Sequence, residues 1–126
     1  MEQRKKYTLE YLLKANPKLI KRFLIEPDGL SSWFAQNVNI NGNVFEFVWE
    51  GSSERGELMT KGFVKETKFK WIDRPTEEFM VFRVEKENLG TGSVLIIEDY
   101  DEANQLEEAE MAWDAAVDKL KSMIGG

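Results

Sequence analysis

The sequence predicts an α+β fold in which a curved antiparallel sheet wraps around one long C-terminal helix. Along the last segment, 104–124, apolar residues recur at steps of three and four, which is typical of one helical face. Most of the preceding chain alternates apolar and polar residues in short stretches separated by turn residues, which indicates about six to seven strands joined by hairpins. An amphipathic sheet and an amphipathic helix bury their apolar faces against each other.

The C-terminal helix has the clearest pattern in the chain. Its apolar face comprises Leu106, Ala109, Trp113, Ala116, Val117, Leu120 and Ile124. Asn104 and Glu107 have the spacing of a capping box, and Gly125 suits the end of the helix. At 1.5 Å per residue the helix would be about 30 Å long, the width of a small domain.

The N-terminal third predicts a strand and two short helices. Residues 5–14 alternate as a half-buried strand does. Asn16 and Pro17 are typical of a helix cap and a first helical residue. The turn residues 26–29 then separate this helix from a second one, expected over 30–36.

The middle of the chain predicts strands in series. They are expected over 37–40, 44–50, 55–64, 67–72, 78–85 and 93–100. Asn41-Gly42 favours a tight hairpin between the first two. Gly56 and Gly62 each fit a bulge in the third. Because several of these strands carry apolar residues on both faces, we expect strong curvature or an outer cover.

Composition limits the classes of function. The 126 residues contain no cysteine and no histidine, so thiolate chemistry and the commonest general base are absent. The net charge of −6 argues against nucleic-acid binding. No apolar run is long enough to span a membrane, and residues 1–6 lack the apolar centre of a signal peptide. We therefore expect one cytoplasmic domain over 1–126, with no cofactor and no metal.

Charge is distributed unevenly along the chain. Residues 1–22 contain seven basic side chains, and residues 98–118 contain nine acidic ones and no basic one. Two solvated faces explain this pattern, and an acidic surface that docks a basic protein partner is the alternative.

Four motifs together resemble one family. They are Asn16-Pro17-Lys18-Leu19-Ile20, Glu26-Pro27-Asp28-Gly29-Leu30 followed by Trp33-Phe34, Asn41-Gly42-Asn43-Val44-Phe45-Glu46-Phe47, and a final helix with Trp113 and Leu120. The chain resembles the START-like (Bet v 1-like, SRPBCC) superfamily with its helix-grip fold. Within that superfamily it resembles bacterial homologues of the Hsp90 ATPase activator domain. The hairpin of that group usually has two glycines, and Asn43 occupies the second position here.

The resemblance implies a cavity between the sheet and the final helix, where many relatives bind a lipid-like or other apolar molecule. The side chains that could line it are Trp33, Phe34, Phe45, Phe47, Trp49, Phe69, Trp71, Phe79, Arg83 and Trp113. The alternative, which the short length of the chain favours, is that the aromatic members of this set fill the core themselves. Trp49, Trp71 and Trp113 would each need a partner for the indole N–H.

Several charged residues have two interpretations. If the strand face that Arg83 shares with Phe79 points inward, its guanidinium needs a carboxylate or an anionic ligand, and otherwise it reaches solvent. Among Glu46, Glu50 and Glu57, a pair could act as acid and base, although outward cross-strand charges are favoured. The acidic set Asp99, Asp101 and Glu102 could bind calcium, but acids beside a helix start explain it better.

Three classes of function follow, in order of preference. The first is a non-catalytic binding module for an apolar small molecule. The second is a protein-interaction module that acts as a chaperone cofactor of the Hsp90 type, with its partner at the acidic surface. The third is a cyclase- or hydrolase-type enzyme, which without histidine would need a buried Glu, Asp or Lys as its base. No catalytic residue is assigned.

Overall fold

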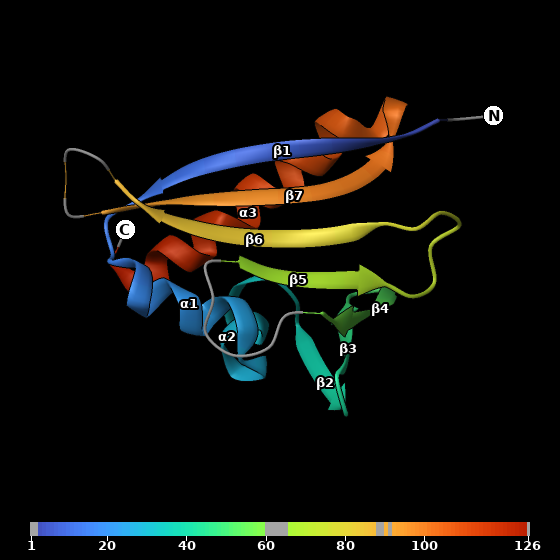
Figure 1. Cartoon of the computed structure of the whole chain (residues 1–126), viewed down its shortest axis with the longest axis horizontal. Helices are drawn as coiled ribbons and strands as arrows, with labels where there is room; N and C mark the ends of the chain where they lie inside the picture. Colours follow the sequence, from blue (N-terminus) through green and yellow to red (C-terminus); the bar gives the residue numbers. More distant parts are fainter. Residues whose placement is uncertain (1–2, 60–65, 88–89, 91, 126) are drawn as a thin grey trace.

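The computed structural model describes residues 3–59, 66–87, 90 and 92–125. In these ranges seven strands form one antiparallel sheet with the order β1-β7-β6-β5-β4-β3-β2. The three α-helices lie on one face of that sheet, and the long α3 crosses behind β1, β7 and β6 (Figure 1). The predicted helix-grip architecture is therefore confirmed.

The elements follow the predicted order closely. They are β1 (Arg4–Leu13), α1 (Pro17–Ile25), α2 (Pro27–Trp33), β2 (Asn37–Asn41), β3 (Val44–Trp49), β4 (Ser52–Leu58), β5 (Glu66–Trp71), β6 (Phe79–Lys86), β7 (Ser93–Glu102), a 3-10 turn over Ala103–Gln105, and α3 (Leu106–Ile124). The predicted strand 55–64 begins earlier, at Ser52, and its last part, with Gly62, lies outside the described residues.

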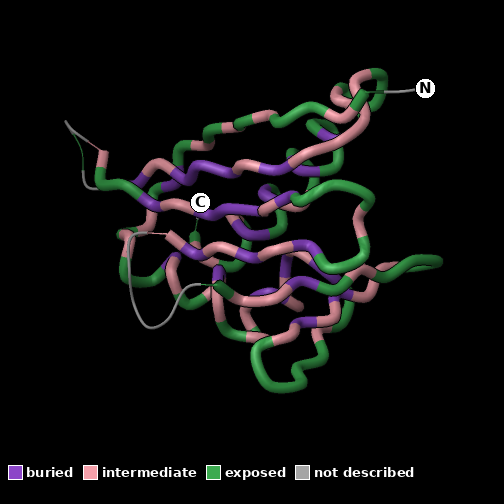
Figure 2. Tube along the Cα trace, turned by 45° about the vertical axis from the view of Figure 1, so that its right-hand side comes forward, coloured by how far each residue is buried: buried purple, intermediate pink, exposed green. Residues whose placement is uncertain are grey.

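Curvature separates two parts of the sheet. The long strands β1, β7 and β6 run side by side, whereas β4, β3 and β2 turn away from them toward α2 (Figure 1). Buried segments concentrate in the central strands and along one side of α3, and exposed ones at the hairpins (Figure 2). The sheet thus forms a concave face that α3, α1 and α2 cover.

The helix α3 buries the predicted face but begins differently. Ala109, Trp113, Val117 and Leu120 are buried. The predicted capping box at Asn104 is wrong, because the chain first makes a 3-10 turn there and Gln105 precedes the helix without a side-chain cap. At the other end Gly125 has φ 86°, which only glycine adopts freely. No helix in the described ranges is both long and apolar enough to cross a bilayer.

The two short helices also differ at their junction. Asn16 caps α1 as predicted, because its side chain accepts a hydrogen bond from the Leu19 N–H at 3.0 Å. The expected turn 26–29 is wrong, since Pro27 starts α2 directly and this helix ends at Trp33. Proline suits the first helical position, where its missing N–H costs nothing. This early start places Trp33 and Phe34 against the core.

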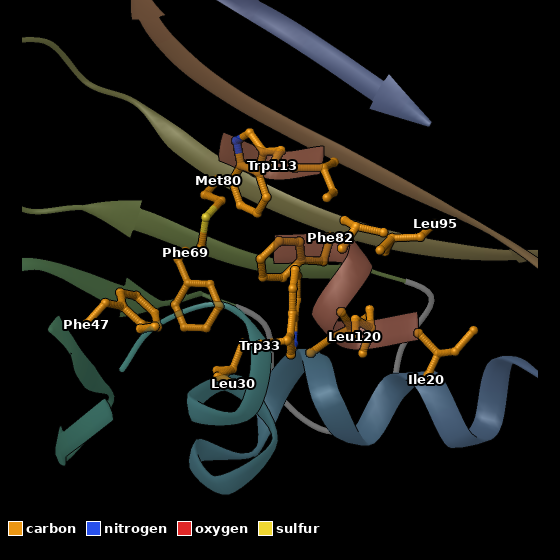
Figure 3. Close-up of a cluster of buried hydrophobic side chains, with 14 of the residues drawn as sticks. Ile20, Leu30, Trp33, Phe47, Phe69, Met80, Phe82, Leu95, Trp113 and Leu120 are labelled. Atoms are coloured by element: carbon orange, nitrogen blue, oxygen red, sulfur yellow. The ribbon is translucent and has the colours of Figure 1, made fainter. Parts of the chain in front are cut away.

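Aromatic rings fill the centre of the concave face. Phe47, Phe69 and Phe82 have no exposed surface, and Figure 3 shows their side chains in one cluster of buried apolar residues. The Phe47 and Phe69 rings meet edge to face at 5.4 Å. Gly56 makes this possible, because a Cβ there would lie only 3.3 Å from the Cβ of Phe69. These rings thus pack directly against one another in the core.

The convex face of the sheet carries a ladder of charges instead. Arg83 lies on this face and contacts Glu66 at 3.4 Å, Glu98 at 3.2 Å and Glu85 at 3.7 Å. Lys6 extends the ladder to β1 through Glu98 at 3.0 Å. Arg83 therefore has carboxylate partners but does not face the interior, so the inward interpretation is wrong.

Candidate functional site

A pocket of about 210 Å³ lies beside the first half of α3, where β7 approaches its end. Its lining combines aromatic, charged and small side chains. These are Tyr7, Phe34, Trp49, Glu54, Trp71, Arg74, Asp99, Asp101, Ala109, Ala112 and Trp113. Ala109 and Ala112 are one turn apart on the helix, and their short side chains leave the space open. We call this space the α3 pocket.

Three tryptophans form the walls of the α3 pocket, and each indole N–H has a partner. Trp113 donates to the Tyr7 hydroxyl at 2.7 Å and Trp49 donates to the Phe34 carbonyl at 2.7 Å. Trp71 donates to Asp99 Oδ1 at 2.9 Å. The predicted need for indole partners is confirmed. Each of the three indole N–H groups is therefore already bound to a protein acceptor.

A cluster of buried charges lies at one side of the pocket, with Arg74 at its centre. Arg74 donates two parallel hydrogen bonds to Glu54, at 2.8 and 2.9 Å. Its Nη1 also donates to Glu78 and to Asp99, both at 3.0 Å. Arg4 adds a second guanidinium, which donates from Nη2 to Glu78 at 3.0 Å and also through Nε. We call this set the arginine cluster.

Burial and hydrogen bonding compete in setting the pKa values of these groups. Burial raises the pKa of Asp99 to about 6, although Arg74 opposes that rise. Burial would also raise the pKa of Glu78, but hydrogen bonds from Arg4, Thr76 and Arg74 outweigh it and lower that pKa to about 2. Burial raises the pKa of the Tyr7 hydroxyl, and the Asp99 charge adds to this. Two neighbouring carboxyls thus titrate in separate pH ranges.

The local sequence explains how these side chains meet. Arg74 is in the loop 72–78 between β5 and β6, and its guanidinium packs over the Trp71 ring at 4.3 Å. Asp99 shares the inner face of β7 with Leu95 and Ile97, four and two residues earlier. It is opposite Tyr7 in the β1–β7 register. The alternation alone therefore brings Asp99 under α3.

Sequence reasoning missed the arginine cluster. It explained Asp99 as an acid beside the start of the helix, which is wrong, because Asp99 is 5% exposed and bonded to Trp71 and Arg74. The alternation Leu95, Ile97, Asp99 was the available signal. Arg74 had no comparable signal, since loop residues follow no periodicity and the direction of a side chain there depends on tertiary contacts.

The predicted site residues separate into three groups. Phe34, Trp49, Trp71 and Trp113 line the α3 pocket. Trp33, Phe45, Phe47 and Phe69 are buried in the filled core. Phe79 and Arg83 lie on the convex face, where Lys68 packs over the Phe79 ring at 4.3 Å. The structure therefore brings four of the ten together at one pocket.

The other candidate acids lie elsewhere. Glu46 and Glu57 accept hydrogen bonds from Asn39 and Asn43 on the convex side, at 3.1 and 3.3 Å, and Glu50 is exposed. They form no acid–base pair with the pocket. Within the described ranges, no three acidic side chains are grouped closely enough to hold a metal ion.

A second hollow of about 300 Å³ lies between α1 and α2. Its lining includes Leu19, Phe23 and Arg22. It lies away from the concave face and the arginine cluster. For this reason the α3 pocket is the stronger candidate for a small-molecule site.

Comparisons with solved structures show the same fold in other proteins. The Aha1 dimer from Colwellia psychrerythraea matches with a TM-score of 0.80 and 15% identity, over 95% of this chain and 96% of that one. Protein MLL2253 of Mesorhizobium loti matches with a TM-score of 0.77 and 17% identity, over 96% of this chain and 97% of that one. CalU16 of Micromonospora echinospora matches with a TM-score of 0.73 and 16% identity, over 96% of this chain and 74% of that one. No curated protein matches the sequence.

A family model decides the assignment. The model of the START-like superfamily domain matches residues 1–126. The sheet order and the position of α3 agree with the fold of that superfamily. The chain therefore belongs to the START-like superfamily.

Proposed function

We propose that this chain is a non-catalytic, cytoplasmic binding module that holds a small apolar molecule in the α3 pocket. The observation that carries the proposal is a hollow of about 210 Å³ walled by three tryptophans and Phe34, at a place where α3 presents two alanines. Pockets for small molecules combine apolar walls with a few polar groups that fix orientation. START-like relatives that bind apolar molecules do so between the sheet and the final helix, as the resemblance implies.

The size of the pocket limits the ligand. A volume of about 210 Å³ is below the usual range of drug-sized sites, about 300–1,000 Å³. The remaining concave face is filled by buried aromatic rings. The proposed ligand is therefore a molecule of about one ring system with short substituents. A long acyl chain is too large for a space of this volume.

Binding is favoured over catalysis by how the polar groups are held. Asp99 is the group in the pocket with a pKa near neutrality, which is the property a general base needs. However, its Oδ1 already accepts from both Trp71 and Arg74. The Arg74 guanidinium is itself enclosed by protein carboxylates. These contacts support a fixed polar wall.

The experiment fills the pocket from the helix. Ala112 is exposed yet lines the α3 pocket, so Ala112→Leu should narrow it without disturbing the core. Ala115 is exposed on the same helix and does not line it, so Ala115→Leu is the matched control. The measurement is saturable quenching of tryptophan fluorescence by the neutral aromatic probe 1-naphthol.

We expect quenching in the wild type and in Ala115→Leu, with an affinity at least about tenfold weaker in Ala112→Leu, as for the loss of one well-packed contact. If the wild type shows no saturable quenching, or if both leucine variants bind like the wild type, the α3 pocket is not the binding site.

A protein-interaction role is the second candidate, and the exposed side of α3 favours it. Glu107, Glu108, Glu110 and Asp114 are exposed there, together with Met111, which is 65% exposed. Exposed methionine among acids suits a basic, apolar peptide. The Aha1 neighbour, which is named as a dimer, and the resemblance to Hsp90 activator domains support it as well.

This candidate has its own test. Bacterial Hsp90 is titrated into the wild type and into Met111→Lys, and its ATPase rate is followed. The interaction role predicts stimulation by the wild type that Met111→Lys abolishes. Equal rates with and without the wild type would exclude an Hsp90-cofactor function.

A further inference from the structure

Carboxylates outnumber guanidinium groups around the α3 pocket. In the arginine cluster, Arg4 and Arg74 face three carboxylates, those of Glu54, Glu78 and Asp99. Each of the three is hydrogen-bonded to a guanidinium. The cluster therefore keeps one negative charge in excess when all of its groups are ionised.

Asp101 adds a second negative charge at the pocket. It lines the α3 pocket, is half-buried, and accepts a hydrogen bond from the Glu102 N–H at 2.8 Å. Among the described residues it forms no ion pair, and none joins it to Lys5, its cross-strand partner on β1. This charge is available to a bound molecule.

Arg74 offers little to an anionic molecule. Its guanidinium donates to Glu54 twice, to Glu78, to Asp99 and to the Tyr100 carbonyl at 3.1 Å. A carboxylate or phosphate on the ligand would have to displace one of these acceptors. It would also approach the carboxylate of Asp101, which forms no ion pair among the described residues. Both effects oppose an anion in this pocket.

The aromatic walls favour the opposite charge. The rings of Phe34 and Trp113 are stacked at 5.2 Å with 15° between their planes, and Trp49 meets Phe34 edge-on at 5.3 Å. The indole N–H groups of Trp49 and Trp113 donate to protein acceptors. The negative potential of ring faces attracts ammonium groups, most strongly where water is displaced.

We propose that the ligand of the α3 pocket is a small aromatic or apolar molecule carrying an amine or quaternary ammonium group, with the cation near Asp101 and the ring faces. This inference rests on the proposed function and specifies the chemical class of its ligand. The cation balances the excess carboxylate charge, and the tryptophan walls hold the apolar part.

The test compares three probes with the same benzyl body and different charge. They are benzyltrimethylammonium, the neutral benzyl methyl sulfone and the anionic benzylsulfonate. Binding is measured by tryptophan fluorescence in the wild type, in Asp101→Asn, and in Asp118→Asn. Asp118 is an exposed acid of α3 that does not line the pocket, so its variant removes the same charge elsewhere.

We expect the ammonium probe to bind about tenfold more tightly than the sulfone, as cation–π and ionic contacts at a partly buried site do, and the sulfonate to bind most weakly. Asp101→Asn should weaken the ammonium probe about fivefold and leave the sulfone unchanged. Asp118→Asn should leave all three affinities as in the wild type.

The failures of the two proposals are distinguishable. Equal affinity for the ammonium probe and the sulfone, or tighter binding of the sulfonate, overturns the cationic ligand while a binding pocket remains. An ammonium affinity that Asp101→Asn does not change also overturns it. If none of the three probes binds, the proposed function and this inference are both overturned.

Discussion

Two parts of the concave face are built from aromatic rings, yet one is closed and the other contains a pocket. The closed part consists of Phe45, Phe47 and Phe69, which have no polar atoms and pack directly on one another. The α3 pocket is walled by tryptophans, whose indole N–H groups need acceptors when buried.

Those acceptors bring buried polar groups to the α3 pocket. The Trp71 indole requires Asp99, and buried Asp99 in turn requires Arg74. Arg74 brings Glu54 and Glu78 with it. Rigid polar groups of this kind cannot interdigitate as phenylalanines do, so a space remains beside them. In this chain the pocket lies where tryptophans bring buried polar partners to the concave face and where α3 carries Ala109 and Ala112.

The largest effect is expected in the closed part. Phe69→Ala removes a ring with no exposed surface and should lower the free energy of unfolding by about 4 kcal/mol, through lost burial and the cavity left behind. Urea denaturation followed by far-UV circular dichroism measures it. A loss below about 1 kcal/mol would show that this part is loosely packed.

Removal of Arg74 should have the next largest effect. Arg74→Met leaves three buried or half-buried carboxylates without their shared partner, so we expect a loss of about 3 kcal/mol in the same assay. Arg83→Met on the convex face is the control. Its partners are partly exposed, and the expected loss is about 1 kcal/mol or less. Equal losses would refute the distinction between the two arginines.

The pKa of Asp99 predicts a pH dependence of stability. Because that pKa is about 6 in the folded state and 3.8 ordinarily, the folded state binds more protons between these values. The contribution of Asp99 to stability therefore falls as the pH rises from about 4 to about 6. Glu78 acts in the opposite sense: its contribution is present above pH 4.5 and is lost as the pH falls toward 2.

Comparison with Asp99→Asn isolates the first effect. The free energy of unfolding of the wild type minus that of this variant should decrease between pH 4 and pH 6 and remain constant above pH 7. Urea denaturation of both proteins at each pH measures it. If this difference increases between pH 4 and pH 6, the attraction of Arg74 influences the pKa of Asp99 more strongly than burial does.

The smallest effect concerns two tyrosines of β1. Tyr7→Phe leaves the N–H of the buried Trp113 without its acceptor and should cost about 1–2 kcal/mol. Tyr11→Phe removes an exposed hydrogen bond to Asp114 and should cost about 0.5 kcal/mol or less. Thermal unfolding of the two variants side by side decides whether the difference exists.

The sequence predicted the fold better than the pocket, for physical reasons. Periodicity identified the buried face of α3 and the inner faces of β1 and β5, because burial imposes it. Boundaries were less predictable: Pro27 satisfies both a turn and a helix start, and only packing distinguished them. Arg74 could not be placed, because a loop residue acquires partners from distant segments, here Glu54 of β4 and Asp99 of β7.

The sequence did not distinguish the residues that line the pocket from those that fill the core. Phe47 and Trp49 alternate on one strand face and have the same pattern in the sequence. Whether a ring at that face is covered depends on what α3 places above it, and Ala109 and Ala112 are what leave the space. That information is tertiary.

The most direct test of the binding pocket is a titration with benzyltrimethylammonium that monitors the indole N–H signals of a ¹⁵N-labelled sample by NMR. The indoles of Trp49, Trp71 and Trp113 line the pocket, whereas Trp33 donates to the Phe23 carbonyl within the core. We expect saturable shifts of the Trp49, Trp71 and Trp113 signals and the smallest shift for Trp33. Absence of any shift, or a shift largest at Trp33, would contradict a ligand site beneath α3.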